Sequence, residues 1–210
     1  MIRNADPVPA IGILGGTFDP VHLGHLRAAI QLLSRASLFE VWLMPNADPP
    51  HRLIKTLASP NQRLRMVELA VAGVEGLRAC ALEVERGGPS YTVDTLAQLG
   101  RSFPGRPFTL LLGFDAALQI GSWHRADVLL RQASFVIFSR PKVFFSTGEI
   151  ERLGFFPERT RVIEIDTPPI SARAVRERLS RGESVEGMLD EAVIDFIREH
   201  DLYPAVGVRG

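Results

Sequence analysis

Cysteine is almost absent from this chain of 210 residues, in which Cys80 is the one example. A single cysteine excludes an intramolecular disulfide and any zinc site built mainly from thiolates. It lies within the strand-like run LRACALEVE at 77–85. We therefore expect Cys80 to be a small buried hydrophobe rather than a reactive thiol.

Long apolar runs and an excess of one charge are also missing. No uninterrupted apolar run approaches the roughly 18 residues that a membrane helix needs, and MIRNADPVPA at the N-terminus has no apolar region typical of a signal peptide. The formal net charge is zero, so nothing global favours nucleic acid or an anionic membrane as a partner. We expect a cytoplasmic protein whose anion binding depends on a local cluster of groups.

Lysine is scarce as well, with only Lys55 and Lys142, so nearly every positive charge is an arginine. Arginine is the better bidentate ligand for phosphate. The length and the hydrophobic content of 46% predict one globular domain over residues 1–210. Within it we expect a polar tail at 1–9 and a helical C-terminal portion at about 170–203. The sequence does not indicate an oligomeric state, and a homo-oligomer is possible.

Continuous apolar runs alternate with segments of helical periodicity along the chain. Such an alternation predicts an α/β fold with a doubly wound parallel sheet, because strands of that sheet are buried on both faces. The predicted strands are 10–14, 39–44, 77–84, 108–112, 134–138 and 161–165. The predicted helices are 23–36, 59–73, 91–99, 116–120, 125–131, 148–153, one that opens at Ser171, and 190–200.

Four polar segments follow directly after predicted strands: GGTFDPVHLGH at 15–25, PNADPPHR at 45–52, GFD at 113–115 and PPISARAVR at 168–176. In doubly wound sheets, ligands bind beyond the carboxyl ends of the strands, near the point where strand order reverses. We therefore expect these four segments to converge on one site.

His22 and His25 stand at the start of a predicted helix, just after a Gly-Gly turn. Free backbone N–H groups and the positive end of the helix dipole favour an anion there, so the stretch predicts a nucleotide-phosphate site. Its glycine spacing fits neither a dinucleotide fingerprint nor a P-loop. Zinc ligation by the two histidines is an alternative, but zinc needs three or four protein ligands and no second His/Cys pair stands nearby.

The pattern H-x-G-H directly after G-G-x-F-D-P is the signature of the nucleotidyltransferase superfamily. From about residue 11 to residue 203 the chain resembles bacterial nicotinate-nucleotide adenylyltransferases. The resemblance depends on GGTFDPVHLGHL at 15–26, PPHR at 49–52, SYTVDTL at 90–96, GFD at 113–115, the pair Trp123-His124, SRP at 139–141 and ISARAVR at 170–176. It implies a Rossmann-like fold and transfer of the adenylyl group of ATP to nicotinate mononucleotide, giving deamido-NAD⁺ and pyrophosphate without a covalent enzyme intermediate.

The resemblance also implies roles for individual residues. His22, His25 and Arg176 would be catalytic, and Arg52, Thr92 and Trp123 would bind the mononucleotide. Magnesium would be carried with the ATP phosphates and not on a protein metal site. The ATP-binding residues would be Gly15, Gly16, Thr17, Phe18, His22, His25, Asp115, Arg140, Ile170, Ser171 and Arg176.

Two departures from the family pattern bear on these roles. Arg52 stands where the family usually has lysine, and Ala172 and Arg173 replace a serine and a threonine of the last motif. One hydroxyl contact to phosphate is thereby in doubt, and Arg173 either substitutes for it or points to solvent. Other nucleotidyltransferases, acting on phosphopantetheine or glycerol phosphate, are the main alternative. A nucleotide-binding regulatory module without turnover and a Rossmann dehydrogenase are more distant ones.

Simpler interpretations exist for several of these side chains. Trp123 could be an aromatic of the core or rim, and Asp115 or Thr92 could cap a helix. Arg63 and Arg65 lie at the start of a predicted helix, and we expect both on the solvated surface. That helix has a strong start, with Ser59 as N-cap, proline at its first position and Gln62 at the position that completes a capping box.

Overall fold

The computed structural model describes residues 8–48, 56–139 and 147–204. Its centre is a parallel sheet of six strands in the order β3-β2-β1-β4-β5-β6. Strand order reverses between β1 and β4, as in doubly wound folds, so the predicted fold class is confirmed. The strands are β1 (Ile11–Gly16), β2 (Glu40–Pro45), β3 (Leu77–Ala79), β4 (Phe108–Gly113), β5 (Ser134–Ser139) and β6 (Thr160–Glu164).

Side chains alternate between the two faces of this sheet because successive residues of a strand point in opposite directions. Leu14 of β1 and Leu111 of β4 belong to one apolar core, whereas Ile13 and Leu110 belong to the other. The strands therefore have few polar positions and read as continuous apolar runs, which is why the sequence identified them.

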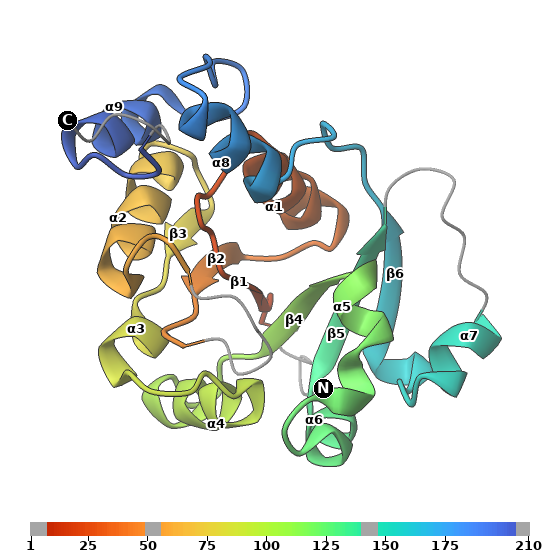
Figure 1. Ribbon diagram of the computed structural model, residues 1–210. Helices are drawn as coiled ribbons and strands as arrows, with labels where there is room; N and C mark the ends of the chain where they lie inside the picture. The colour runs from red at the N-terminus through yellow and green to blue at the C-terminus, as the bar shows by residue number, and fades with distance from the viewer. Residues whose placement is uncertain (1–7, 49–55, 140–146, 205–210) are drawn as a thin grey trace.

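Two groups of helices cover the two faces. One face carries α1 (Leu23–Arg35), α2 (Pro60–Val71), α8 (Ala172–Ser180) and α9 (Glu191–Glu199). In Figure 1 these four lie together in the upper left half of the view. The other face carries α4 (Thr92–Ser102), α5 (Phe114–Leu118), α6 (Ala126–Gln132) and α7 (Thr147–Arg152). Short 3₁₀ turns follow at η1 (Ile120–Ser122) and η2 (Pro157–Arg159).

Side-chain caps define the starts of three helices. Ser59 and Gln62 form the predicted capping box of α2: the serine hydroxyl accepts from the backbone N–H of Gln62 at 3.3 Å, and the glutamine accepts from that of Ser59 at 2.9 Å. Ser171 caps α8 and Asp190 caps α9. These caps satisfy N–H groups that have no partner within the helix.

The predicted strand at 77–84 is wrong in its second half. β3 ends at Ala79, and the chain turns into the short helix α3 (Leu82–Arg86). Two acidic residues, Glu83 and Glu85, stand in the first turn of α3, where they complement the positive end of the helix dipole. Cys80, in the connection between the two, is half-buried against the second core and is not a residue of the strand.

The expectation that Arg63 lies on the solvated surface is also wrong, whereas Arg65 is exposed as expected. Arg63 is fully buried, with 0% of its surface exposed. It shares the buried face of α2 with Met66, Val67 and Ala70, three, four and seven positions later. This helical spacing places its guanidinium inside the protein, where it contacts the loops after β1 and β2.

Among the described residues, no helix is long and apolar enough to cross a membrane. The cytoplasmic location and the single domain over residues 1–210 stay predictions.

Candidate active site

Two adjoining cavities lie at the carboxyl ends of β1 and β4, where strand order reverses. Their volumes are about 580 Å³ and about 480 Å³. His25, Leu14 and Gly113 are among the residues that line both. The two cavities therefore meet at His25, and the expectation that the four polar segments converge on one edge agrees with this geometry.

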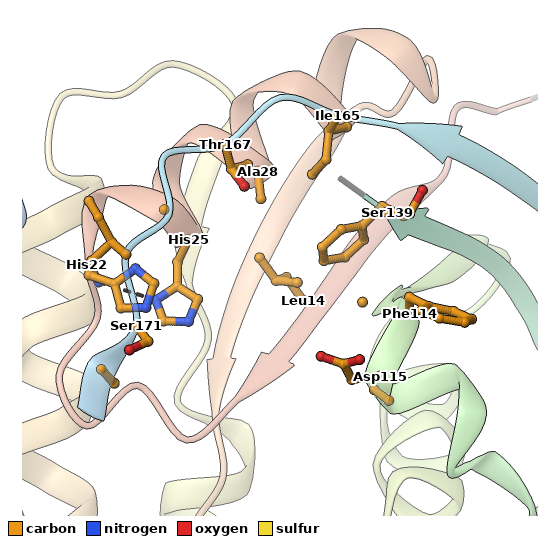
Figure 2. Close-up of a pocket in the computed structure, with 16 residues that line it drawn as sticks. Leu14, His22, His25, Ala28, Phe114, Asp115, Ser139, Ile165, Thr167 and Ser171 are labelled. Atoms are coloured by element: carbon orange, nitrogen blue, oxygen red, sulfur yellow. Dashed lines mark hydrogen bonds between the residues drawn. The ribbon is translucent and has the colours of Figure 1, made fainter. Parts of the chain in front are cut away.

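The first cavity is lined by polar groups from α1, α5, α8 and the connection after β6. Figure 2 shows His22, His25 and Ser171 grouped on one side and Asp115 on the other, with Leu14 of β1 between them. The N-terminal ends of α1 and α8 are next to this cavity, since His22 and Ser171 are their N-cap residues. Such helix ends favour anions.

The two histidine rings are stacked, with centroids 3.6 Å apart and planes inclined by 23°. The backbone N–H of His22 donates to Nδ1 of His25 at 3.2 Å. A ring nitrogen that accepts a hydrogen bond carries no proton, so the neutral ring of His25 has its proton on Nε2. Phe18 contacts this ring edge-on, at a centroid distance of 5.0 Å, and limits its rotation.

Burial and, to a smaller extent, the nearby His22 together lower the pKa of His25 from 6.5 to about 3. The imidazole is therefore neutral at physiological pH in the free protein. With Nδ1 occupied, its Nε2–H is the group left to donate at the junction of the two cavities.

The glycine between the two histidines leaves room for the ring of His22. A Cβ atom at Gly24 would lie 2.9 Å from Nδ1 of His22, too close without a shift of that ring. The position is buried and lines the first cavity. The glycine of H-x-G-H therefore keeps the ring of His22 in place beside the start of α1.

The first cavity is lined at the start of α8 by Ile170, Ser171 and Ala172. The hydroxyl of Ser171 accepts from the backbone N–H of Ala174 at 3.2 Å. Arg173 is 83% exposed and its Nε donates to Glu177 at 2.8 Å. Arg173 was expected either to replace the missing phosphate contact or to point to solvent, and the structure favours the second alternative.

Of the three predicted arginines, only Arg176 lies in the described part of the chain, and it lines neither cavity. Arg176 donates to the backbone carbonyl of Asp19 at 2.7 Å, and so contacts the loop after β1 from α8. Its role in phosphate binding stays a prediction. Arg52 and Arg140 lie outside the described residues.

The second cavity is lined by Thr92 and Trp123, which were predicted to bind the mononucleotide. Gly15, Gly16 and Thr17, which were predicted to bind ATP, line this cavity and not the first, and Phe18 lines neither. Asn46, Ser90, Tyr91 and His124 line it too, although the sequence analysis did not single them out. The rings of Tyr91 and His124 lie 4.3 Å apart. All four residues belong to segments from which site residues were expected, namely PNADPPHR, SYTVDTL and the pair Trp123-His124, but the resemblance assigned them no role.

The simpler interpretations of Asp115 and Thr92 are not supported. Gly113 is the N-cap of α5 and Tyr91 is the N-cap of α4, so Asp115 and Thr92 are residues of the helices themselves. Trp123 is half-buried and packs against the second core while lining the cavity. It is thus an aromatic of the cavity wall.

A polar trio, in which Glu83 and Thr95 are buried, was missed in the sequence. Glu83 accepts a hydrogen bond from the hydroxyl of Thr95 at 2.6 Å, and Arg86 donates to the same hydroxyl oxygen at 3.0 Å. Glu83 and Thr95 line the second cavity. The trio joins α3 to α4 and so fixes the helix that begins at Thr92.

Comparison with known proteins identifies the family to which the chain belongs. The sequence matches the cytidylyltransferase-like family over residues 13–178. It is 39% identical to the probable nicotinate-nucleotide adenylyltransferase of Geobacillus thermodenitrificans over 197 residues, which are 93% of this chain and 86% of that protein. It is 37% identical to that of Salinibacter ruber over 193 residues, 92% of this chain and 97% of the relative.

The fold is similar to that of the Plasmodium falciparum nicotinic acid mononucleotide adenylyltransferase, solved in complex with NaAD. The TM-score is 0.77 at 22% identity, and the alignment covers 93% of this chain and 97% of that one. The chain belongs to the cytidylyltransferase-like family and, within it, to the nicotinate-nucleotide adenylyltransferases.

Proposed function

We propose that the enzyme uses the first cavity for ATP and the second for nicotinate mononucleotide, and that it joins them at His25. The overall reaction transfers the adenylyl group of ATP to the mononucleotide and releases pyrophosphate. The observation that carries this proposal is the position of His25, which lines both cavities. The α-phosphate of ATP must lie where the two substrates meet.

For the ATP half, we assign the phosphates to the end of the first cavity that holds His22, His25 and Ser171. The ends of α1 and α8 supply N–H groups and positive dipole ends there. Asp115 lies across the cavity from them (Figure 2). We assign Asp115 to the nucleoside part of ATP or to its metal ion, because a carboxylate would repel bare phosphates.

For the mononucleotide half, Trp123 supplies an aromatic wall for the pyridine ring. Thr92 and Tyr91 stand at the start of α4 in the same cavity. Backbone N–H groups at that helix end can receive the pyridine carboxylate. This anion-binding helix end favours nicotinate, which carries the carboxylate, over nicotinamide as the substrate. Arg52 is expected to contact the phosphate of the mononucleotide.

The chemistry needs positioning and charge stabilisation more than a base. A phosphate monoester has a second pKa near ~6, so the attacking group is already largely dianionic at neutral pH. One of its oxygens forms a bond to the α-phosphorus of ATP while the bond from that phosphorus to the bridging oxygen of pyrophosphate breaks. A neutral His25 can donate its Nε2–H to a non-bridging oxygen throughout this exchange.

Magnesium is expected to accompany the ATP phosphates. Mg²⁺ typically uses one or two carboxylates together with phosphate oxygens and water. Among the described residues that line the first cavity, Asp115 alone carries a carboxylate, and no group of three or more potential metal ligands occurs in the described parts of the chain. This donor set fits an ion held mainly by substrate, which would neutralise phosphate charge.

The stereochemistry at the α-phosphorus tests direct transfer between the two cavities. ATP carrying a chiral phosphorothioate at the α position is incubated with nicotinate mononucleotide, and the configuration of the dinucleotide product is determined. A single in-line displacement predicts inversion. Retention would indicate a covalent adenylyl-enzyme intermediate and would contradict the proposal.

A further inference from the structure

Arg63 is a charged side chain with no part in the functional assignments made so far. It is fully buried on α2, on the same helix face as Met66 and Val67. Burying a guanidinium is costly unless its donors are satisfied, because the charge loses its water. The partners of Arg63 therefore indicate what this position does.

Those partners belong to the loops that follow β1 and β2. One terminal nitrogen of Arg63 donates to the backbone carbonyl of Thr17 at 2.7 Å and to Oδ1 of Asn46 at 3.1 Å. The other terminal nitrogen donates to the backbone carbonyl of Ala47 at 3.0 Å. A single planar group thus connects the glycine turn of β1 to the polar segment of β2.

The contact with Asn46 also determines the orientation of its amide. A guanidinium has donors only, so the atom of Asn46 that it contacts must be the oxygen. The amide nitrogen, which can only donate, is then the group that remains for other partners. Asn46 is half-buried and lines the second cavity, where the mononucleotide is assigned.

The same network continues to the far wall of this cavity. The backbone N–H of Ala47 donates to the hydroxyl of Ser90 at 3.0 Å, and the backbone N–H of Ser90 donates to the carbonyl of Asp48 at 3.0 Å. Ser90 lines the cavity two positions before Thr92. The loop held by Arg63 thereby sets the distance between the glycine turn and the start of α4.

We propose that Arg63 is a positioning residue for adenylyl transfer, and that it acts by presenting the amide nitrogen of Asn46 to an oxygen of the mononucleotide. Arg63 itself touches no substrate. Its guanidinium fixes the loops after β1 and β2 in one arrangement, and Asn46 donates from that arrangement to a phosphate or ribose oxygen. The inference rests on the assignment of the second cavity to the mononucleotide.

The variant Asn46→Asp distinguishes the acceptor oxygen of the Asn46 amide from its donor nitrogen. Aspartate keeps the acceptor for Arg63 but replaces the donor with an anionic oxygen. We expect the melting temperature to stay the same or rise, while the Kd and KM for nicotinate mononucleotide increase about ten- to a hundred-fold. The KM for ATP should change much less. Calorimetric titration with nicotinate mononucleotide gives the Kd directly.

The coupling between the two residues is tested with Arg63→Lys, Arg63→Met and Asn46→Ala, singly and in combination. If Arg63 acts through Asn46, then Asn46→Ala weakens mononucleotide binding by a smaller factor in the Arg63 variants than in the parent. Lysine keeps the charge without the fork of donors, so Arg63→Lys should fold and still weaken binding. Arg65→Met is the matched control, because Arg65 is exposed on the same helix.

Normal mononucleotide binding by Asn46→Asp would overturn the inference. Independent effects, in which the factors by which Arg63→Lys and Asn46→Ala weaken mononucleotide binding multiply in the double variant, would also overturn it. A lower melting temperature of Arg63→Lys with an unchanged KM for the mononucleotide would do the same. If Arg63→Met does not fold, Asn46→Asp and Arg63→Lys decide the question. A folded parent that releases no pyrophosphate from ATP and nicotinate mononucleotide would overturn the proposed function, and this inference with it.

Discussion

Tyr203 donates its phenolic hydrogen to Oδ1 of Asp19 at 2.7 Å and so joins residues 184 positions apart in the chain. Asp19 also accepts from the backbone N–H groups of Leu57 and Ala58 at 3.0 and 3.1 Å. Burial raises the pKa of Tyr203, as does its hydrogen bond to Asp19, so the phenol remains a donor. The C-terminal segment is thereby fixed to the loop after β1.

Removal of this hydroxyl should destabilise the protein. Tyr203→Phe leaves a buried carboxylate with one donor fewer, and we expect a loss of about 1–3 kcal/mol in the free energy of unfolding by urea. Ser34→Ala is the control, because the hydroxyl of Ser34 is exposed and its loss should cost less than about 0.5 kcal/mol. Equal effects of the two variants would contradict a stabilising role for the Tyr203–Asp19 bond.

Replacement of His25 should reduce turnover more than stability. His25→Ala removes the Nε2–H donor at the junction of the cavities, and we expect kcat to fall about 10²- to 10³-fold. His25→Gln restores a donor near the same place and should recover part of the rate. His200→Ala, on the exposed end of α9, should keep the parent kcat. An unchanged kcat in folded His25→Ala would show that His25 does not contact the reacting phosphates.

The stability of the parent should fall in mild acid because of His25. Its pKa of about 3 in the folded protein is below the usual 6.5, so the unfolded chain binds the proton first as pH decreases. This contribution is constant above pH 6.5 and decreases between pH 6.5 and pH 3. At pH 5 the loss amounts to about 2 kcal/mol, from roughly 1.5 pH units at about 1.4 kcal/mol each.

Urea unfolding of the parent and His25→Gln at pH 8, 7, 6 and 5 measures this difference. The two proteins should lose stability in parallel between pH 8 and pH 7 and diverge below, with the parent losing more. Parallel loss down to pH 5 would mean that His25 titrates normally in the folded protein.

Trp123 should matter for the mononucleotide and not for ATP. Stacking of an aromatic side chain on a heterocycle is worth roughly 1–3 kcal/mol, so Trp123→Ala should raise the KM for nicotinate mononucleotide about ten-fold or more. Trp123→Phe should have a smaller effect. Phe156→Ala is the control, because Phe156 is exposed and lines neither cavity. A rise in the KM for ATP alone would place Trp123 in the other half of the site.

Elements with a strong local pattern were predictable from the sequence. The apolar runs of β1, β4 and β5 indicated the fold class, and the capping box predicted the start of α2. The predicted strand at 77–84 was too long because Leu82 and Val84 continue the apolar alternation of the sequence. In the structure, these two residues belong to α3 and not to the sheet. Tertiary contacts of α3 with α4, through Glu83 and Thr95, decide that segment instead.

Arg63 shows the limit of reading side chains by type. Its position relative to Met66, Val67 and Ala70 placed it on the buried face of α2, but arginine is rarely fully buried, so we expected it to be exposed. Its burial depends on acceptors supplied by Thr17, Asn46 and Ala47, from two loops distant in sequence. Such partners come together only through the sheet order, which the sequence pattern does not specify.

The most direct test of the assignment is pyrophosphate release from ATP and Mg²⁺ with nicotinate mononucleotide or with nicotinamide mononucleotide, followed by chromatography of the dinucleotide product. We expect pyrophosphate and deamido-NAD⁺ in equal amounts, with kcat/KM higher for the nicotinate form. No pyrophosphate with either mononucleotide would contradict the enzyme assignment. A preference for the amide would keep the chemistry and contradict the assignment of the second cavity to nicotinate.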